Sequence, residues 1–159
     1  MALWKLLCSL GLHRKVVDLM EGLYTDTCSC VNVDGVMSDW FAVGSGVRQS
    51  CRIAPDLFLG PMDHMMESTI HQVTTGVITL GKEVFTDLDF ADDVSLLAEM
   101  LEVLVLALTV MQEEASTFSL QINWSKTKIL QVPSSTSSST VQVADGHVEV
   151  VDAFVYLGA

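Results

Sequence analysis

The chain has 159 residues, half of them hydrophobic, which is enough for one compact domain with a core and argues against disorder along the whole length. Twenty acidic residues against eight basic ones give a net charge of −12. That balance opposes non-specific binding to nucleic acid, because such binding needs Lys and Arg side chains facing phosphates.

Helical periodicity and a hairpin signal mark the first half of the chain. Apolar residues recur at a helical period over 2–10 and 13–24, with Gly11 between the two segments. Alternating residues on either side of Asp34-Gly35 predict a β-hairpin. After a loop at 44–46, Pro55 is placed as the first residue of a helix that runs to about 72, and Pro61 should kink that helix or end its first segment.

The second half alternates hairpins with one long helix. A strand region over 77–90 leads to a hairpin with Asp92 and Asp93 at its tip and 94–98 as the return strand. Residues 100–118 predict a helix whose apolar stretch is too short to span a membrane, so we expect no membrane partner. A short strand within 126–132 and a Ser/Thr-rich segment precede a last hairpin with its turn at Asp145-Gly146. Helices alternating with antiparallel hairpins indicate an α+β fold.

Cysteine spacing favours thiols without a metal. Cys8, Cys28, Cys30 and Cys51 form no Cys-x-x-Cys pair, which predicts reduced, mostly buried thiols in an intracellular protein. A zinc site at Cys28 and Cys30 would need two further ligands from scattered places.

Two adjacent carboxylates at a hairpin tip, Asp92 and Asp93, are the chemically unusual feature of the sequence. Held together by a sheet, their repulsion is best relieved by a divalent cation such as Mg²⁺, which takes one or two carboxylates plus phosphate oxygens and water. Two such ions can activate an attacking hydroxyl and stabilise a leaving pyrophosphate. The plain alternative is a solvated Asp-Asp turn, because Asp is common in turns.

Four segments together resemble the motifs of reverse transcriptases, in the family's order and at plausible spacing. They are Gly-Val-Arg-Gln-Ser-Cys-Arg-Ile-Ala-Pro at 46–55, Phe-Ala-Asp-Asp at 90–93, Leu-Gln-Ile-Asn-Trp-Ser-Lys-Thr-Lys at 120–128 and Phe-Val-Tyr-Leu-Gly at 154–158. The likeness is closest to reverse transcriptases of LINE-type, non-LTR retrotransposons, and it covers essentially the whole chain.

The resemblance implies a fold and an activity. It implies an α+β, palm-like fold of antiparallel hairpins packed with helices. Residues 1–132 would be a partial palm, 133–140 a linker, and 141–159 a C-terminal hairpin with the start of a primer-grip-like region. The implied activity is RNA-directed DNA polymerisation by two-metal nucleotidyl transfer, with Mg²⁺ as cofactor and an RNA template and DNA primer as partners.

The resemblance also implies roles for individual residues, each with a plain alternative. Asp92 and Asp93 would bind metal, Lys126 would donate a proton to pyrophosphate, and the nucleotide and template would lie near Gly46, Arg48 and Gln49. The primer end would be supported by Tyr156, Leu157 and Gly158. Alternatively, Arg48 pairs with a nearby acid, Gln49 satisfies loop backbone groups, Lys126 is solvated and Tyr156 belongs to the core.

Departures from the family pattern predict an inactive fragment. The family's third catalytic Asp ends a strand before the helix that resembles residues 2–7, so the strand and its Asp are expected to be missing. Ser50 stands where the family has Gly, and Arg52 where it usually has Pro. Two other hypotheses are an unselected retroelement relic and a non-catalytic interaction domain. In the latter, an exposed edge or the Met-rich helix around Met62, Met65 and Met66 binds a partner, and the chain self-associates.

Overall fold

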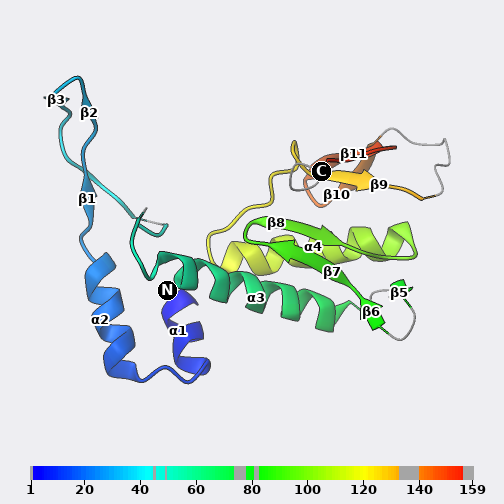
Figure 1. The fold of residues 1–159 in the computed structure, drawn as a ribbon, viewed down its shortest axis with the longest axis horizontal. Coiled ribbons are helices and arrows are strands. Elements are labelled where there is room, and N and C mark those ends of the chain that lie inside the picture. The colour runs from blue at the N-terminus through cyan, green and yellow to red at the C-terminus, as the bar shows by residue number, and fades with distance from the viewer. Residues whose placement is uncertain are drawn as a thin grey trace. The chain divides into compact units, whose positions relative to one another are not determined.

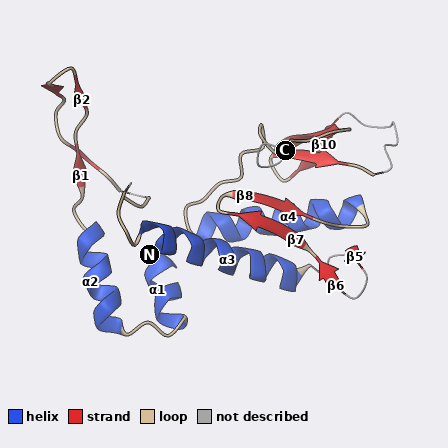
Figure 2. Cartoon of the chain, viewed as in Figure 1, coloured by secondary structure: helices blue, strands red, loops and turns tan. Residues whose placement is uncertain are grey.

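The computed structural model describes residues 2–44, 46–48, 50–73, 78–80, 83–132 and 140–155. These residues form four helices and eleven short strands, which confirms the α+β class (Figures 1 and 2). The helices are α1 (Ala2–Ser9), α2 (Arg14–Tyr24), α3 (Ala54–Gln72) and α4 (Leu101–Thr117). The strands are β1 (Cys28–Ser29), β2 (Asn32–Val33), β3 (Val36–Met37), β4 (Phe41–Ala42), β5 (Ile78–Leu80), β6 (Glu83–Phe85), β7 (Asp87–Phe90), β8 (Asp93–Leu96), β9 (Lys128–Leu130), β10 (Thr140–Val143) and β11 (Gly146–Val151).

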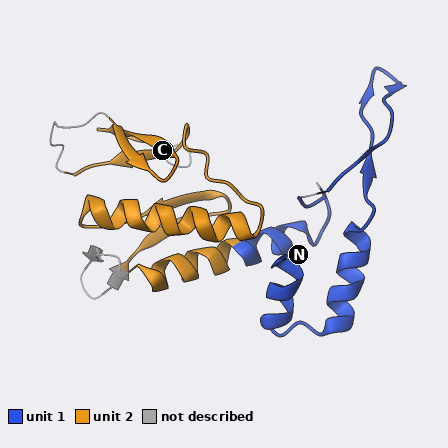
Figure 3. Cartoon of the chain, turned by 180° about the vertical axis from the view of Figure 1, so that it is seen from behind, with its two compact units in different colours: residues 1–61 blue, residues 62–159 orange. Residues whose placement is uncertain are grey.

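The chain divides into two compact units, residues 1–61 and 62–159 (Figure 3). None of the described helices is long and apolar enough to cross a membrane.

The first unit has a small core between α1, α2 and the start of α3. Trp4 and Leu7 of α1 pack with Val17 of α2 and Leu57 of α3, and all four side chains are buried. Only part of the apolar face predicted for 13–24 therefore packs against α1, because Leu19 and Leu23 of α2 remain exposed. Burial of each large apolar side chain contributes about 1.5–3 kcal/mol.

A hairpin follows α2, as the Asp34-Gly35 signal predicts. Val33 and Val36 pair across a two-residue turn, and both central residues have positive φ, 51° at Asp34 and 84° at Gly35. These are the angles that a type I′ turn requires and that Asp-Gly favours. The side chain of Asn32 accepts a hydrogen bond from the N–H of Gly35 at 3.0 Å, which adds support to the turn.

Helix α3 begins one residue before Pro55 and continues through Pro61 to Gln72. We predicted that Pro61 would kink the helix or end its first segment, and the second of these outcomes is wrong. A proline removes one helical N–H and strains one turn, and the nineteen-residue helix has hydrogen-bonded turns on both sides of it. The boundary between the two units falls at this residue.

The core of the second unit lies between α4 and the sheet β10-β11-β9. Leu108 of α4 packs with Ile129, Val143 and Val148, one from each strand. Strand β11 pairs antiparallel with β10 and parallel with β9. Described residues 140–151 therefore share one sheet with 128–130.

Helix α3 contributes buried methionines to the second unit. Met62, Met65 and Met66 are all buried, so they are not available as the exposed partner-binding helix face that the sequence suggested. Helices α3 and α4 are joined on their polar side by a 2.7 Å hydrogen bond from Gln72 to Glu114. The sulfur-containing side chains of the three methionines fill irregular space between helices, which is a common role of methionine in cores.

The turn of the last hairpin is shifted by one residue from the prediction. Val143 pairs with Gly146, so the central turn residues are Ala144 and Asp145. Gly146 instead lies in β11 beneath the ring of Trp124, where an added Cβ would stand 2.6 Å from the ring's Cδ1. Close approach of the indole therefore places glycine in the strand, and the Asp-Gly pair does not form the turn.

Candidate functional site

The Asp92–Asp93 pair lies on the β7–β8 hairpin, as predicted, with a small shift in register. Phe90 pairs with Asp93 across a turn formed by Ala91 and Asp92, so Asp93 is the first residue of β8. Ala91 has a φ of 57°, a left-handed conformation that costs a residue with a Cβ about 1–2 kcal/mol. Such local strain is common at functional sites, and here it fixes the carboxylates at a sharp turn.

The register assigns the hairpin side chains to two faces. Residues opposite each other in an antiparallel pair share a face, so Phe90 and Asp93 lie on one face and Asp87 and Leu96 on the other. Leu96 packs against the core formed by α4 and the β10-β11-β9 sheet. The face with Phe90 and Asp93 is therefore turned away from that core, and Phe90 is 65% exposed.

The donor chemistry of Asp92 and Asp93 fits a hard divalent cation. Both residues are exposed, and adjacent carboxylate oxygens are the ligands that Mg²⁺ takes together with phosphates and water. Within the described ranges, no group of three or more His, Cys, Asp or Glu side chains is arranged to hold a metal ion. The pair can therefore provide part of a coordination shell, and other oxygen ligands would complete it.

Lys126 lies in the same unit, in the turn between α4 and β9. Its backbone N–H donates to the carbonyl of Asn123 at 3.0 Å, and its side chain is exposed. The Asn123 side chain also accepts this N–H at 3.3 Å and a hydrogen bond from Ser125 at 2.7 Å. An Asn that organises its own turn explains the position of the lysine by local hydrogen bonding.

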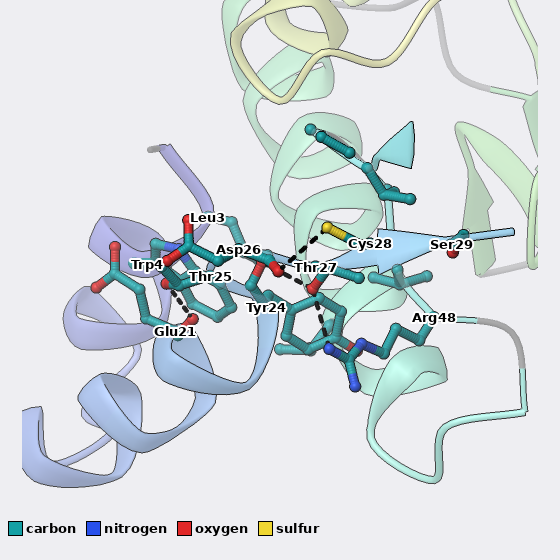
Figure 4. A pocket seen from close by; sticks show the side chains of 16 residues that line it. Leu3, Trp4, Glu21, Tyr24, Thr25, Asp26, Thr27, Cys28, Ser29 and Arg48 are labelled. Atoms are coloured by element: carbon teal, nitrogen blue, oxygen red, sulfur yellow. Dashed lines mark hydrogen bonds between the residues drawn. The ribbon is translucent and has the colours of Figure 1, made fainter. Parts of the chain in front are cut away.

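Gly46 and Arg48 lie together in the first unit and line a cavity of about 860 Å³ (Figure 4). Gly46 has a φ of 86°, and an added Cβ would meet no atom within 4 Å, so conformation rather than space calls for glycine. Arg48 donates to the Thr27 hydroxyl at 3.0 Å, and its Cζ lies 5.7 Å from the centre of the Tyr24 ring. The guanidinium thus contacts a hydroxyl and an aromatic face, whereas the plain alternative for Arg48 was a pair with a nearby acid.

The remaining predicted site residues lie outside the described residues: Gln49, Tyr156, Leu157 and Gly158. The same holds for 133–139 of the predicted linker, whereas Thr140 lies in β10.

Two ionisable groups beside the cavity have shifted pKa values. Burial raises the pKa of Tyr24, and the neighbouring Cys51 thiol adds to the increase. The pKa of Cys51 is lowered, first by the backbone N–H of Ile53 and then by the Tyr24 hydroxyl. All four cysteines are free thiols, as predicted, but none is fully buried and Cys28 is exposed.

Sequence reasoning missed the aromatic side of this cavity. Trp4 and Tyr24 line it, with ring centroids 6.1 Å apart and planes at 50°. Both residues lie at helical spacing among apolar neighbours. This pattern is the same for a core position and for a cavity wall, so the sequence could not distinguish the two. Among the lining residues, the sequence pointed here only through Gly46 and Arg48, which belong to the motif at 46–55.

Comparison with protein families identifies the chain. A sequence model of the family described as reverse transcriptase (RNA-dependent DNA polymerase) matches residues 4–159. The chain belongs to this family. A search of curated proteins found no match to it. Proteins of this family bind a nucleic acid template and primer, and they generally use a divalent metal.

Proposed function

We propose that the chain provides the palm part of a reverse transcriptase of LINE-type, non-LTR retrotransposons, with Asp92 and Asp93 as metal-binding residues. The observation that carries the proposal is the Phe-Ala-Asp-Asp hairpin, whose strained turn presents two adjacent exposed carboxylates inside a chain of this family. The order and spacing of the other three motifs support it.

The proposed mechanism gives each predicted site residue its own role. Divalent ions, when bound, would supply positive charge that lowers the pKa of the primer hydroxyl and stabilises the leaving pyrophosphate. Asp92 and Asp93 hold negative charge at a fixed turn, with Asp92 the more direct ligand. Lys126 donates a proton to pyrophosphate. Gly46, Arg48 and Gln49 position nucleotide and template, and Tyr156 to Gly158 support the primer end.

Metal binding by the pair is testable with Mn²⁺ as a paramagnetic probe. We expect Mn²⁺ to broaden the backbone amide NMR signals of 91–94 selectively, with millimolar affinity, and expect Asp92→Asn/Asp93→Asn to remove the effect. Asp89→Asn is the matched control, because Asp89 lies on the opposite face of the same hairpin and carries the same charge. Equal broadening in the double variant would contradict the assignment.

The 159 residues alone are proposed not to extend a primer, since two carboxylates are fewer than a two-metal site uses. The measurement is primer extension on an RNA template with Mg²⁺ or Mn²⁺. No incorporation is expected. Incorporation that Asp92→Ala abolishes would show that the chain by itself holds a complete catalytic site.

A second candidate function, non-catalytic protein interaction, is favoured by the exposed apolar residues of the first hairpin. Val36 is 73% exposed, and Val31 and Val33 share its face in the register of β2 and β3. Such a two-stranded ribbon has open edges that can pair with another chain. Light scattering distinguishes the cases: self-association that Val33→Asp weakens supports interaction, and a monomer at all concentrations opposes it.

A further inference from the structure

Helix α2 has an apolar face that its packing against α1 leaves exposed. Val17 of α2 is fully buried in the core of the first unit, on the side where α2 lies beside α1 (Figure 1). On another side, Val16, Leu19 and Leu23 are 44%, 72% and 56% exposed. They are three and four residues apart, which places them within about 60° of one another around the helix. These three residues are called the α2 stripe below.

The polar side of α2 is separate from the stripe and is occupied by ion pairs within the helix. Arg14 contacts Asp18 at 2.7 Å and Glu21 at 3.9 Å. A helix with one core contact needs only one apolar face, and α2 has a second one. Contiguous exposed apolar side chains of this kind mark interaction surfaces, so the α2 stripe is the side of the helix that a partner would cover.

The charges of α2 run against the dipole of the helix and describe the partner that fits it. Its two cations, Arg14 and Lys15, lie in the first turn, and its last turn carries no basic residue. The N-terminus of a helix carries partial positive charge and the C-terminus partial negative charge, so cations are favourable at the C-terminal end. A fitting partner therefore offers negative partial charge near Lys15 and a cation near the C-terminal end of α2.

A second copy of α2 that lies antiparallel has this chemistry. The stripe is nearly symmetric about Leu19, so an antiparallel copy sets Val16 of one chain against Leu23 of the other, and Leu19 against Leu19. Lys15 of each copy then lies beside the C-terminal turn of the other copy. Gly22 leaves room for it there, because an added Cβ at Gly22 would meet no atom within 4 Å.

We propose that the α2 stripe is a self-association surface on which two copies of the chain pack antiparallel. The surface needs neither metal nor nucleic acid, so it does not rest on polymerase activity, and it uses residues other than those of the β2–β3 hairpin. Residues 1–61 contain five basic and six acidic residues, so little of the net charge of −12 opposes the contact locally.

The length of α2 sets the strength of the association. An eleven-residue helix is about 16 Å long, so the contact covers less than the roughly 800 Å² per partner of a standard interface. We expect a dissociation constant of about 10–100 µM, which sedimentation equilibrium of the full chain over about 5–500 µM measures.

A charge in the middle of the stripe should weaken the association. Leu19→Glu should raise the dissociation constant at least about tenfold, because it sets two carboxylates against each other in an apolar contact. Leu106→Glu is the matched control, because Leu106 is a 53% exposed leucine of α4 outside the stripe. In this variant the dissociation constant should stay within about twofold of wild type.

Lys15→Glu tests the antiparallel orientation. The new carboxylate would lie beside the negative C-terminal turn of the other copy, so the dissociation constant should rise about 3- to 10-fold. Within its own helix the carboxylate lies in the first turn, where an acid is favourable, so the free energy of unfolding of the monomer in urea should not fall. Weaker association without a loss of stability separates the lost contact from damage to the fold.

Four results would overturn the proposal. A monomer throughout the concentration range would mean that the stripe does not bind a second copy. An unchanged dissociation constant in Leu19→Glu would remove the stripe from the contact, and tighter association of Lys15→Glu would contradict the antiparallel arrangement. Association that Val33→Asp weakens and Leu19→Glu does not would assign the contact to the first hairpin.

Discussion

Ser50 adopts a backbone conformation that glycine prefers. Its φ is 63°. The resemblance of 46–55 to a reverse transcriptase motif implies glycine at this position. A left-handed residue with a Cβ costs about 1–2 kcal/mol, partly offset by the greater unfolded entropy of glycine. We expect Ser50→Gly to raise the free energy of unfolding by about 0.5–1 kcal/mol in urea titration.

A second serine provides the comparison for this substitution. Ser68 lies inside α3, where glycine is destabilising, so Ser68→Gly should lower the free energy of unfolding by about 0.5–1 kcal/mol. If the free energy of unfolding changed with the same sign in both variants, the backbone conformation of residue 50 would not be the cause of the change in Ser50→Gly.

The Cys51 thiol is expected to react faster near neutral pH than an ordinary cysteine, because a larger fraction of it is thiolate. Its pKa lies below the usual 9.0, mainly because the Ile53 N–H stabilises the thiolate. A lowered pKa in the folded state means that more thiolate is present at pH 7–8.5 and that ionisation adds stability as pH rises toward 9. The pH midpoint of Cys51 alkylation by iodoacetamide, assigned by mass spectrometry, should therefore lie below 9.

The unfolded chain is the reference for this measurement. In urea the hydrogen bond is lost, and the alkylation midpoint of Cys51 should return to the ordinary value of 9.0. The same midpoint in buffer and in urea would mean that the fold does not stabilise the thiolate.

At the scale of elements, the turn of the β10–β11 hairpin depends on a contact from outside the hairpin. An added Cβ at Gly146 would lie 2.6 Å and 2.8 Å from two Trp124 ring atoms, which forces the indole to move. We expect Gly146→Ala to lower the free energy of unfolding by about 1–3 kcal/mol, the usual cost of overpacking, and Trp124 fluorescence in urea reports it.

Gly22 offers the same substitution with the opposite expected sign. It lies within α2, and an added Cβ there would meet no atom within 4 Å. Because alanine is the better helix former, Gly22→Ala should raise the free energy of unfolding by about 0.5–1 kcal/mol. A loss of stability at both glycines would point to a general effect of the change rather than to the Trp124 contact.

Elements with strong local signals were predictable, and those decided by distant contacts were not. The Asp34-Gly35 turn has the two positive φ values that its residues favour, and the helix over 100–118 was expected within one residue of α4. Asp145-Gly146 carried the same signal as Asp34-Gly35, yet Trp124 moved the turn by one residue. The carboxylate pair was predictable because it is local, whereas the cavity needs Trp4 and Tyr24 from two helices.

The whole molecule carries its candidate residues in two units. Asp92, Asp93 and Lys126 belong to the second unit, and Gly46 and Arg48 to the first. Each unit has its own buried hydrophobic cluster, so the candidate residues of a unit are supported by the core of that unit.

Net charge determines how the whole chain should respond to nucleic acid and salt. The net charge is −12, and of eight basic residues, Arg14 is paired with Asp18 and Lys128 with Glu149, each at 2.7 Å. A protein that contacts 6–10 phosphates loses about 10³–10⁵ in affinity between 50 and 200 mM salt, because counterions are no longer released favourably. Twenty acidic residues outnumber the six basic residues outside these two pairs, so we expect phosphate contacts to be few and offset by repulsion.

We therefore expect weak binding of a labelled RNA–DNA primer–template, with an affinity that changes less than about tenfold between 50 and 200 mM NaCl. Fluorescence anisotropy measures the affinity and its change with salt, and salt should screen repulsion as much as attraction.

The variant Arg48→Gln separates the effect of one local charge from the effect of the net charge. Because Arg48 faces Tyr24 and Thr27 in the first unit, a specific contact would make this variant weaker at both salt concentrations, whereas a purely global effect would leave its affinity within twofold of wild type. A steep salt dependence in the wild-type chain would require a basic surface, which contradicts the charge argument.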